Sequence, residues 1–173
     1  MSTTSSRTSS ARRWSVVSGL IQDGGSLLLV ANRRRNGSID WSPPGGVIDP
    51  GEVELGALTR EVAEETGLVV SEWSDPVYDV TVDFGERGGE LLVVVYRALA
   101  WSGEISIDDP DEIVHEAAFH PIEQCHERLC SAPAWVADPL LDWLREGFTE
   151  LRSYAYRVVG GTDLSSLVVE RLR

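Results

Sequence analysis

Residues 46–68 read GVIDPGEVELGALTREVAEETGL, and this segment decides the fold that we expect. Within it, Glu54–Thr66 has the periodicity of an amphipathic helix. Leu55, Leu58 and Val62 fall on one face when successive residues are turned by about 100°. The next residue is a glycine, which is suited to end a helix in the left-handed conformation. The segment therefore predicts a loop followed by a helix with one buried face.

Three glutamates share one flank of this predicted helix. Glu61, Glu64 and Glu65 stand at positions i, i+3 and i+4, a spacing at which like charges destabilise an isolated helix by a few tenths of a kcal/mol per pair. A bound cation would offset that repulsion, and oxygen ligands favour Mg²⁺ or Mn²⁺ over zinc. Taken alone, however, three such glutamates are more simply explained as a solvated acidic face.

The residues around the glutamates favour a metal site instead. Residues 43–46, Pro-Pro-Gly-Gly, form a stiff turn whose glycines let the backbone approach a ligand closely. Arg60 lies beside the carboxylates and can pair with Glu52. The turn at residues 49–51, Asp-Pro-Gly, holds that glutamate at the entrance of the helix.

With these residues in place, the segment resembles the Nudix box, a motif of fixed glycine, glutamate, arginine and apolar positions. Every fixed position is filled, by Gly46, Glu52, Arg60, Glu61, Val62, Glu64, Glu65, Gly67 and Leu68. The match extends to the preceding Trp-Ser-Pro-Pro-Gly-Gly and to the order of strands and helices on both sides. We therefore expect an α/β Nudix fold, an α/β/α sandwich with a mixed sheet and a loop-helix-loop box.

The resemblance implies a Mg²⁺- or Mn²⁺-dependent hydrolase that cuts a phosphoanhydride bond in a substrate containing a nucleoside diphosphate. The family's metal ligands correspond to Gly45 (through its carbonyl), Glu61, Glu64 and Glu65. Glu52 and Arg60 correspond to the supporting ion pair. The glutamate that takes the proton from the attacking water varies in the family, and the candidates are Glu61, Glu112 and Glu116.

The leading substrate hypothesis is a nucleoside triphosphate, oxidised forms included, that is released as monophosphate and pyrophosphate. An ADP-ribose or nucleotide-sugar pyrophosphatase is the alternative, although the proline that marks some of these enzymes is missing near Val82. A nucleotide-binding regulator without catalysis is a third reading. It is disfavoured because all the box glutamates are present.

Outside the box, the pattern predicts strands at residues 14–21, 26–31, 77–84, 91–99 and 113–119 and helices at residues 122–130 and 139–148. The turn at residues 22–25 would join the first two strands as a hairpin. We expect residues 1–13 to be a disordered tail, 14–147 to form the hydrolase domain, and 148–173 to be an extension with strand character packed on it.

Several other side chains have a simple and a functional reading. Residues 33–35, Arg-Arg-Arg, either contact substrate phosphates or form a solvated loop. Trp41 either stacks on a base or anchors the turn that follows it. Three histidines, His115, His120 and His126, lack metal-ligand spacing and are expected to be structural or exposed. Ser18 and Ser42 have no visible base partner, so the sequence does not support a Ser-His-Asp triad.

The formal net charge of −13 disfavours binding to nucleic-acid polymers, but a cation can still recruit a small phosphorylated substrate. Two cysteines, Cys125 and Cys130, give neither a disulfide framework nor a zinc site. The chain has no apolar run that predicts a membrane span and no signal-peptide pattern, so a cytoplasmic location is expected. A homodimer is an expectation from the family alone.

Overall fold

The computed structural model describes residues 12–34, 36–85, 88–160 and 167–173. The tail expected at residues 1–13 lies outside these residues except for its last two. The strands are β1 (Arg13–Leu20), β2 (Gln22–Asp23), β3 (Ser26–Arg33), β4 (Ile39–Ser42), β5 (Gly45–Val47), β6 (Val69–Asp83), β7 (Glu90–Ser102), β8 (Val114–Pro121), β9 (Arg152–Gly160) and β10 (Leu167–Arg171). The helices are α1 (Glu54–Thr66), α2 (Ile122–Leu129) and α3 (Ala134–Glu146).

The strands form two sheets. The larger has the order β10-β9-β6-β7-β1-β5, and it is mixed because β1 runs parallel to β7 and β9 runs parallel to β6, whereas the other pairs are antiparallel. In the smaller sheet, β3 pairs with β2 and β4, and it also pairs with β8. The expected α/β fold with a mixed sheet is confirmed.

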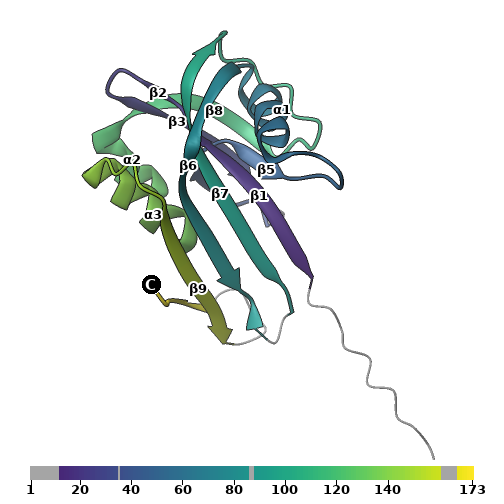
Figure 1. The fold of residues 1–173 in the computed structure, drawn as a ribbon, viewed down its shortest axis with the longest axis vertical. Helices are drawn as coiled ribbons and strands as arrows, with labels where there is room; N and C mark the ends of the chain where they lie inside the picture. The colour runs from purple at the N-terminus through teal and green to yellow at the C-terminus, as the bar shows by residue number, and fades with distance from the viewer. Residues whose placement is uncertain (1–11, 35, 86–87, 161–166) are drawn as a thin grey trace, which may run out of the picture.

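Helices cover both sides of the strands, as Figure 1 shows: α1 lies on the side opposite to α2 and α3. Two hydrophobic clusters fill the two interfaces. Along β3, Leu27 and Leu29 belong to the cluster beneath α2 and α3, while Leu28 belongs to the cluster beneath α1. This alternation follows from the two-residue period of a strand that is buried on both faces.

Helix α1 has the bounds that the sequence predicts, and Gly67 caps it with a left-handed φ of 74°. Its buried apolar face differs by one residue from the prediction. Leu55 is 41% exposed, whereas Ala57, Leu58 and Val62 are buried. The helix is rotated so that small Ala57 faces the sheet, and this rotation also brings Glu65 inside.

The hairpin predicted between the first two strands is wrong. β1 lies in the larger sheet between β7 and β5, and only the short β2 pairs with β3 across the turn. The chain leaves β1 at Leu20 and enters the second sheet. Both segments are apolar and nearly continuous, so their composition does not reveal which sheet each one joins.

Helix α3 begins five residues before the predicted start at Pro139. Proline is favoured in the first turn of a helix, where its missing N–H costs nothing. Instead Pro139 lies inside the helix and is buried together with Ala137, Leu140 and Trp143. Burial of this apolar face stabilises a helix that contains a proline beyond its first turn.

Beyond α3 the chain adds two strands to the larger sheet. β9 runs parallel to β6, with Val80 opposite Tyr154, and β10 closes the sheet edge beside β9. Tyr154 and Tyr156 are buried in the cluster beneath α3. The segment after residue 148 therefore contributes side chains to the main core.

Candidate active site

The turn before α1 brings backbone and carboxylates into contact. Gly46 lies so close to Glu61 that a Cβ on this glycine would be 2.3 Å from the Glu61 Cδ atom. Gly45 has a φ of 151°, and a Cβ there would be 2.1 Å from the Val17 carbonyl oxygen. Only glycine fits at these two positions between β1 and α1, which explains why the sequence has two consecutive glycines there.

Arg60 joins three of the glutamates. Its Nε and Nη2 atoms donate to the two carboxylate oxygens of Glu52, at 3.1 and 3.0 Å. Its Nη1 atom donates to Glu61 at 2.8 Å and to Glu64 at 3.2 Å. The forked contact lowers the pKa of Glu52, whose carboxylate also accepts the backbone N–H of Asp49 at 3.3 Å. The supporting ion pair expected between Arg60 and Glu52 is present.

Glu65 is the most buried acid of the helix, with 8% of its surface exposed. Its carboxylate accepts the backbone N–H of Gly45 at 2.8 Å. Burial raises the pKa of Glu65 to about 8, against the lowering effect of that hydrogen bond, and the negative charges of Glu61, Asp109 and Glu64 raise it further. Burial also raises the pKa of Glu61.

The acids of α1 have the chemistry of a hard-cation site. Among the described residues, no three carboxylate, imidazole or thiol side chains are already gathered closely enough to hold a metal ion. The guanidinium of Arg60 contacts an oxygen of Glu61 and one of Glu64. The donors are oxygens only, and two of them, Glu61 and Glu65, bear pKa values that a nearby cation would lower. This donor set fits Mg²⁺ or Mn²⁺.

The loop before β8 adds carboxylates that the sequence analysis did not select. Asp109 and Asp111 line the same cavity as Glu61, and the charge of Asp111 raises the pKa of Glu61. Asp109 is fixed by the backbone N–H groups of Ile113 and Val114, at 2.7 and 2.8 Å. The Asp108 N–H donates to the Glu64 carbonyl at 2.8 Å and joins this loop to α1.

The two late-loop candidates from the sequence lie elsewhere. Glu116 is exposed on β8, opposite Ala31 of β3, and neither it nor Glu112 lines the cavity. The strand alternation explains the difference for Glu116, because its neighbour Ala117 is buried and Glu116 therefore points to the other face.

A cavity of about 640 Å³ opens beside the glutamates. One end is acidic, with Glu61, Glu65 and the two loop aspartates. Its walls are apolar, and are formed by residues of β1, β6, β7 and α3 that include Val16, Tyr78, Val80, Leu91, Val93, Trp135 and Val136. A volume of this size suits a small-molecule ligand.

The cavity is also lined by Asn32 of β3 and Asp40 of β4, two polar residues that the sequence analysis missed. The Asn32 amide donates to the Ser42 hydroxyl at 2.9 Å, and Asp40 accepts from Arg34 at 2.7 Å. The second oxygen of Asp40, Oδ1, is buried and has no hydrogen-bond partner among the described residues. No motif marks these positions, since only the pairing of Asn32 with Asp40 across β3 and β4 brings them together.

Several other side chains have the packing or surface position that the sequence analysis considered for them. Trp41 is 8% exposed and packs edge-on against His120, with ring centroids 4.8 Å apart, so it is a packing anchor. His120 is buried. Arg33 contacts His115 at 3.4 Å, while Arg34 lines the cavity. The third arginine of that loop, at position 35, lies outside the described residues.

The comparison with known proteins agrees with this geometry. A family model described as NUDIX domain matches residues 11–144. The chain belongs to the Nudix family. It is a Nudix hydrolase that acts on pyrophosphate bonds. None of the described helices is long and apolar enough to cross a membrane.

Similar proteins come from bacteria and from mammals. A Mycobacterium tuberculosis protein named "Putative 8-oxo-dGTP diphosphatase 2" is 36% identical over 110 residues, which cover 56% of this chain and 77% of the relative. The rat asymmetrical bis(5'-nucleosyl)-tetraphosphatase is 28% identical over 133 residues, 62% of this chain and 82% of that enzyme. The crystal structure of a MutT protein from Bacillus halodurans superposes with a TM-score of 0.66 at 20% identity, over 91% of this chain and 97% of that one.

Proposed function

We propose that this Nudix hydrolase converts a nucleoside triphosphate, oxidised forms included, to the monophosphate and pyrophosphate. Mg²⁺ or Mn²⁺ would be held by Glu61, Glu64 and Glu65, with the carbonyl of Gly45 as a further ligand. The proposal is carried by one observation: a single cavity is lined by Glu61 and Glu65 at one end and has an unpaired acceptor, Asp40 Oδ1, among its polar groups.

The polar groups of β3 and β4 suit the edge of a nucleobase. A buried carboxylate oxygen without a partner is costly, and a ligand N–H would satisfy it. Guanine offers such donors at N1 and N2, and its 8-oxo form has another at N7. The apolar walls would enclose the ring. The name of the Mycobacterium tuberculosis relative supports a substrate of this class.

The cation, Arg60 and the acidic side chains have different roles in the proposed reaction. The bound cation would offset phosphate charge and acidify the attacking water. Arg60 is a positioning residue, since its forked contact with Glu52 keeps the acids of α1 in one orientation. Glu61 is the first candidate for the general base because burial raises its pKa, and Asp111 is the second because it lies in the same cavity.

A hydrolysis screen of the purified protein with Mg²⁺ tests the proposal. The panel contains nucleoside triphosphates, 8-oxo-dGTP, ADP-ribose, NADH and dinucleoside polyphosphates, and the products are separated by chromatography. Glu64→Gln is expected to abolish turnover, whereas Glu150→Gln, which replaces an exposed glutamate outside the cavity, is expected to leave it unchanged.

The pattern of products decides the substrate. Release of pyrophosphate and monophosphate from a triphosphate supports the proposal, and Asp40→Asn should then raise KM for the preferred base more than it lowers kcat. Exclusive turnover of ADP-ribose or of dinucleoside polyphosphates would replace the proposed substrate by one of those classes.

A further inference from the structure

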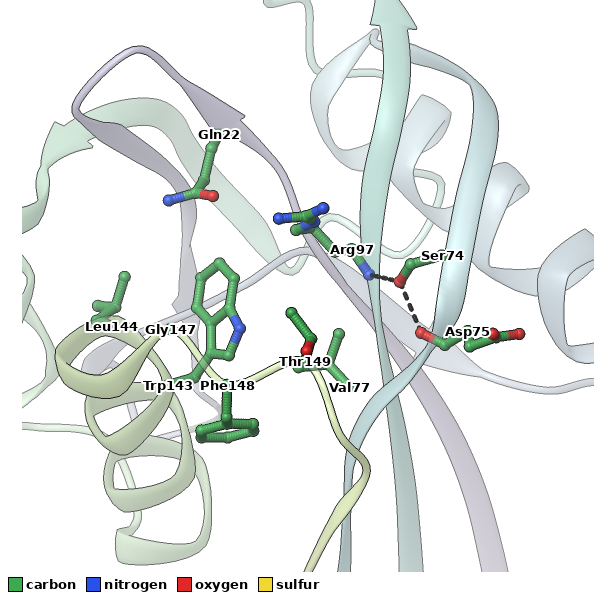
Figure 2. A pocket seen from close by; sticks show the side chains of 10 residues that line it. All are labelled: Gln22, Ser74, Asp75, Val77, Arg97, Trp143, Leu144, Gly147, Phe148 and Thr149. Carbon is green, nitrogen blue, oxygen red and sulfur yellow. Dashed lines mark hydrogen bonds between the residues drawn. The ribbon is translucent and has the colours of Figure 1, made fainter.

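A second cavity, of about 310 Å³, shares no lining residue with the acidic one. Figure 2 shows it between the end of α3 and strands β6 and β7. Trp143 supplies an aromatic wall, and Gln22, Arg97 and Thr149 supply polar groups. The ring of Phe148 points away from Arg97, and the guanidinium of Arg152 lies 3.8 Å from its centroid. The proposed hydrolysis uses none of these residues.

Arg97 is the unusual member of this cavity. Three described arginines are partly buried, and two of them have acidic partners: Arg60 contacts the helix glutamates and Arg152 contacts Glu146 at 2.6 Å. Within the described part of the chain, the guanidinium of Arg97 has no hydrogen bond, ion pair or ring contact. Its backbone is engaged: the N–H donates to the Ser74 hydroxyl at 3.0 Å, and the residue pairs with Leu20 of β1. An unpaired, partly buried arginine stands out in a chain with 28 acidic and 15 basic residues.

The side chains around Arg97 leave its charge available. In Figure 2 its guanidinium points toward the space between Gln22 and Trp143, whereas the carboxylate of Asp75 points away from that space. The C-terminal end of α3 borders the same cavity, but the Gly147 N–H already caps the Trp143 carbonyl at 2.8 Å, and a helix terminus carries only about half a charge. The full charge of Arg97 therefore dominates.

We propose that this cavity binds a small aromatic organic anion, in which a planar ring carries a phosphate or carboxylate group. The guanidinium of Arg97 presents parallel N–H donors that match such a group in two-point geometry. The amide of Gln22 and the hydroxyl of Thr149 also line the cavity and can donate further hydrogen bonds. The indole of Trp143 packs against the ring.

Calorimetry in metal-free buffer with EDTA tests this proposal, with phenyl phosphate and benzoate as probes. Inorganic phosphate and benzyl alcohol serve as the two half-ligands, one with the charge alone and one with the ring alone. Arg97→Gln is expected to weaken binding about tenfold or more, because it removes a charge-assisted contact. Arg97→Lys should give an intermediate loss. Arg145→Gln, which removes an exposed arginine near the cavity, should change nothing.

Indole N–H signals in ¹⁵N-¹H spectra identify the cavity that is occupied. The signal of Trp143 should move on addition of the probe, while that of Trp135, which lines the acidic cavity, should not. Preference for phenyl phosphate or for benzoate then distinguishes the two kinds of anion. The proposal is overturned if wild type and Arg97→Gln bind the probes with equal affinity, or if no saturable binding occurs at millimolar concentration. It is also overturned if only the Trp135 signal moves, or if the half-ligands bind as tightly as the whole probes.

Discussion

The contact between Gly46 and Glu61 allows a sharp test of the site. In Gly46→Ala the new Cβ would lie 2.3 Å from Cδ and 2.5 Å from both carboxylate oxygens of Glu61. Ordinary contact needs about 3.5–4.0 Å between such atoms, so the carboxylate must move by more than about 1 Å. Gly46 does not have a left-handed φ, and alanine therefore adds no backbone strain at this position.

The expected consequence is loss of activity with little loss of stability. A displacement of about 1 Å at a catalytic group costs on the order of 100-fold in rate. The obstructing atoms belong to the end of a flexible side chain, so the melting temperature should change only slightly. The measurements are kcat and KM with Mg²⁺, together with thermal unfolding. Gly25→Ala is the matched control, because its Cβ would meet nothing within 4 Å and its φ is ordinary.

A double-variant cycle identifies Glu61 as the affected group. If the alanine acts by moving this carboxylate, Gly46→Ala should add little further loss in a Glu61→Gln background. The reasoning is refuted if Gly46→Ala retains activity within about threefold of wild type. It is also refuted if the losses of the two single variants multiply.

Three further outcomes are expected. Without metal, the free energy of unfolding should fall as the pH rises from about 4.5 toward 8, because the pKa of Glu65 is higher in the folded state than in the unfolded state. Urea unfolding of Glu65→Gln across that pH range should show a smaller fall in this free energy. Asp111→Asn should lower kcat in the hydrolysis assay, while Glu116→Gln should not, since only Asp111 lines the cavity; the reverse result would restore the sequence-based candidate. Gly67→Ala should lower the melting temperature by several degrees, because the φ of 74° disfavours alanine and its Cβ would be 2.7 Å from the Ser106 carbonyl oxygen; an unchanged melting temperature would contradict this.

The sequence predicts the box well because its information is local. The helix, its glycine cap and the spacing of the glutamates all follow from a period of 3.6 residues over one short segment. The ion pair between Arg60 and Glu52 is also predictable, since the residues lie within two turns of each other. The rotation of the helix is less certain from the pattern, and it depends on whether Leu55 or Ala57 meets the sheet.

The rest of the cavity depends on pairing between distant segments. Asp40 and Asn32 meet because β3 and β4 are antiparallel neighbours, and Asp111 reaches Glu61 because the loop before β8 folds over α1. Nothing in the composition of these segments marks a ligand site. The same limit explains the wrong hairpin, because an apolar strand does not encode which sheet it enters.

The hydrogen bonds of Arg60 suggest how the acids of α1 are held with and without a bound metal ion. The carboxylates of Glu61 and Glu64 repel each other, and Arg60 offers one nitrogen, Nη1, to both of them. Its other two nitrogens are committed to Glu52. A divalent cation would compete for the carboxylates shared by Nη1 without disturbing the fork on Glu52. The same arginine can therefore neutralise the acids when no metal is bound and orient the helix when one is, which explains why the motif needs an arginine, with its separate donors, rather than a lysine.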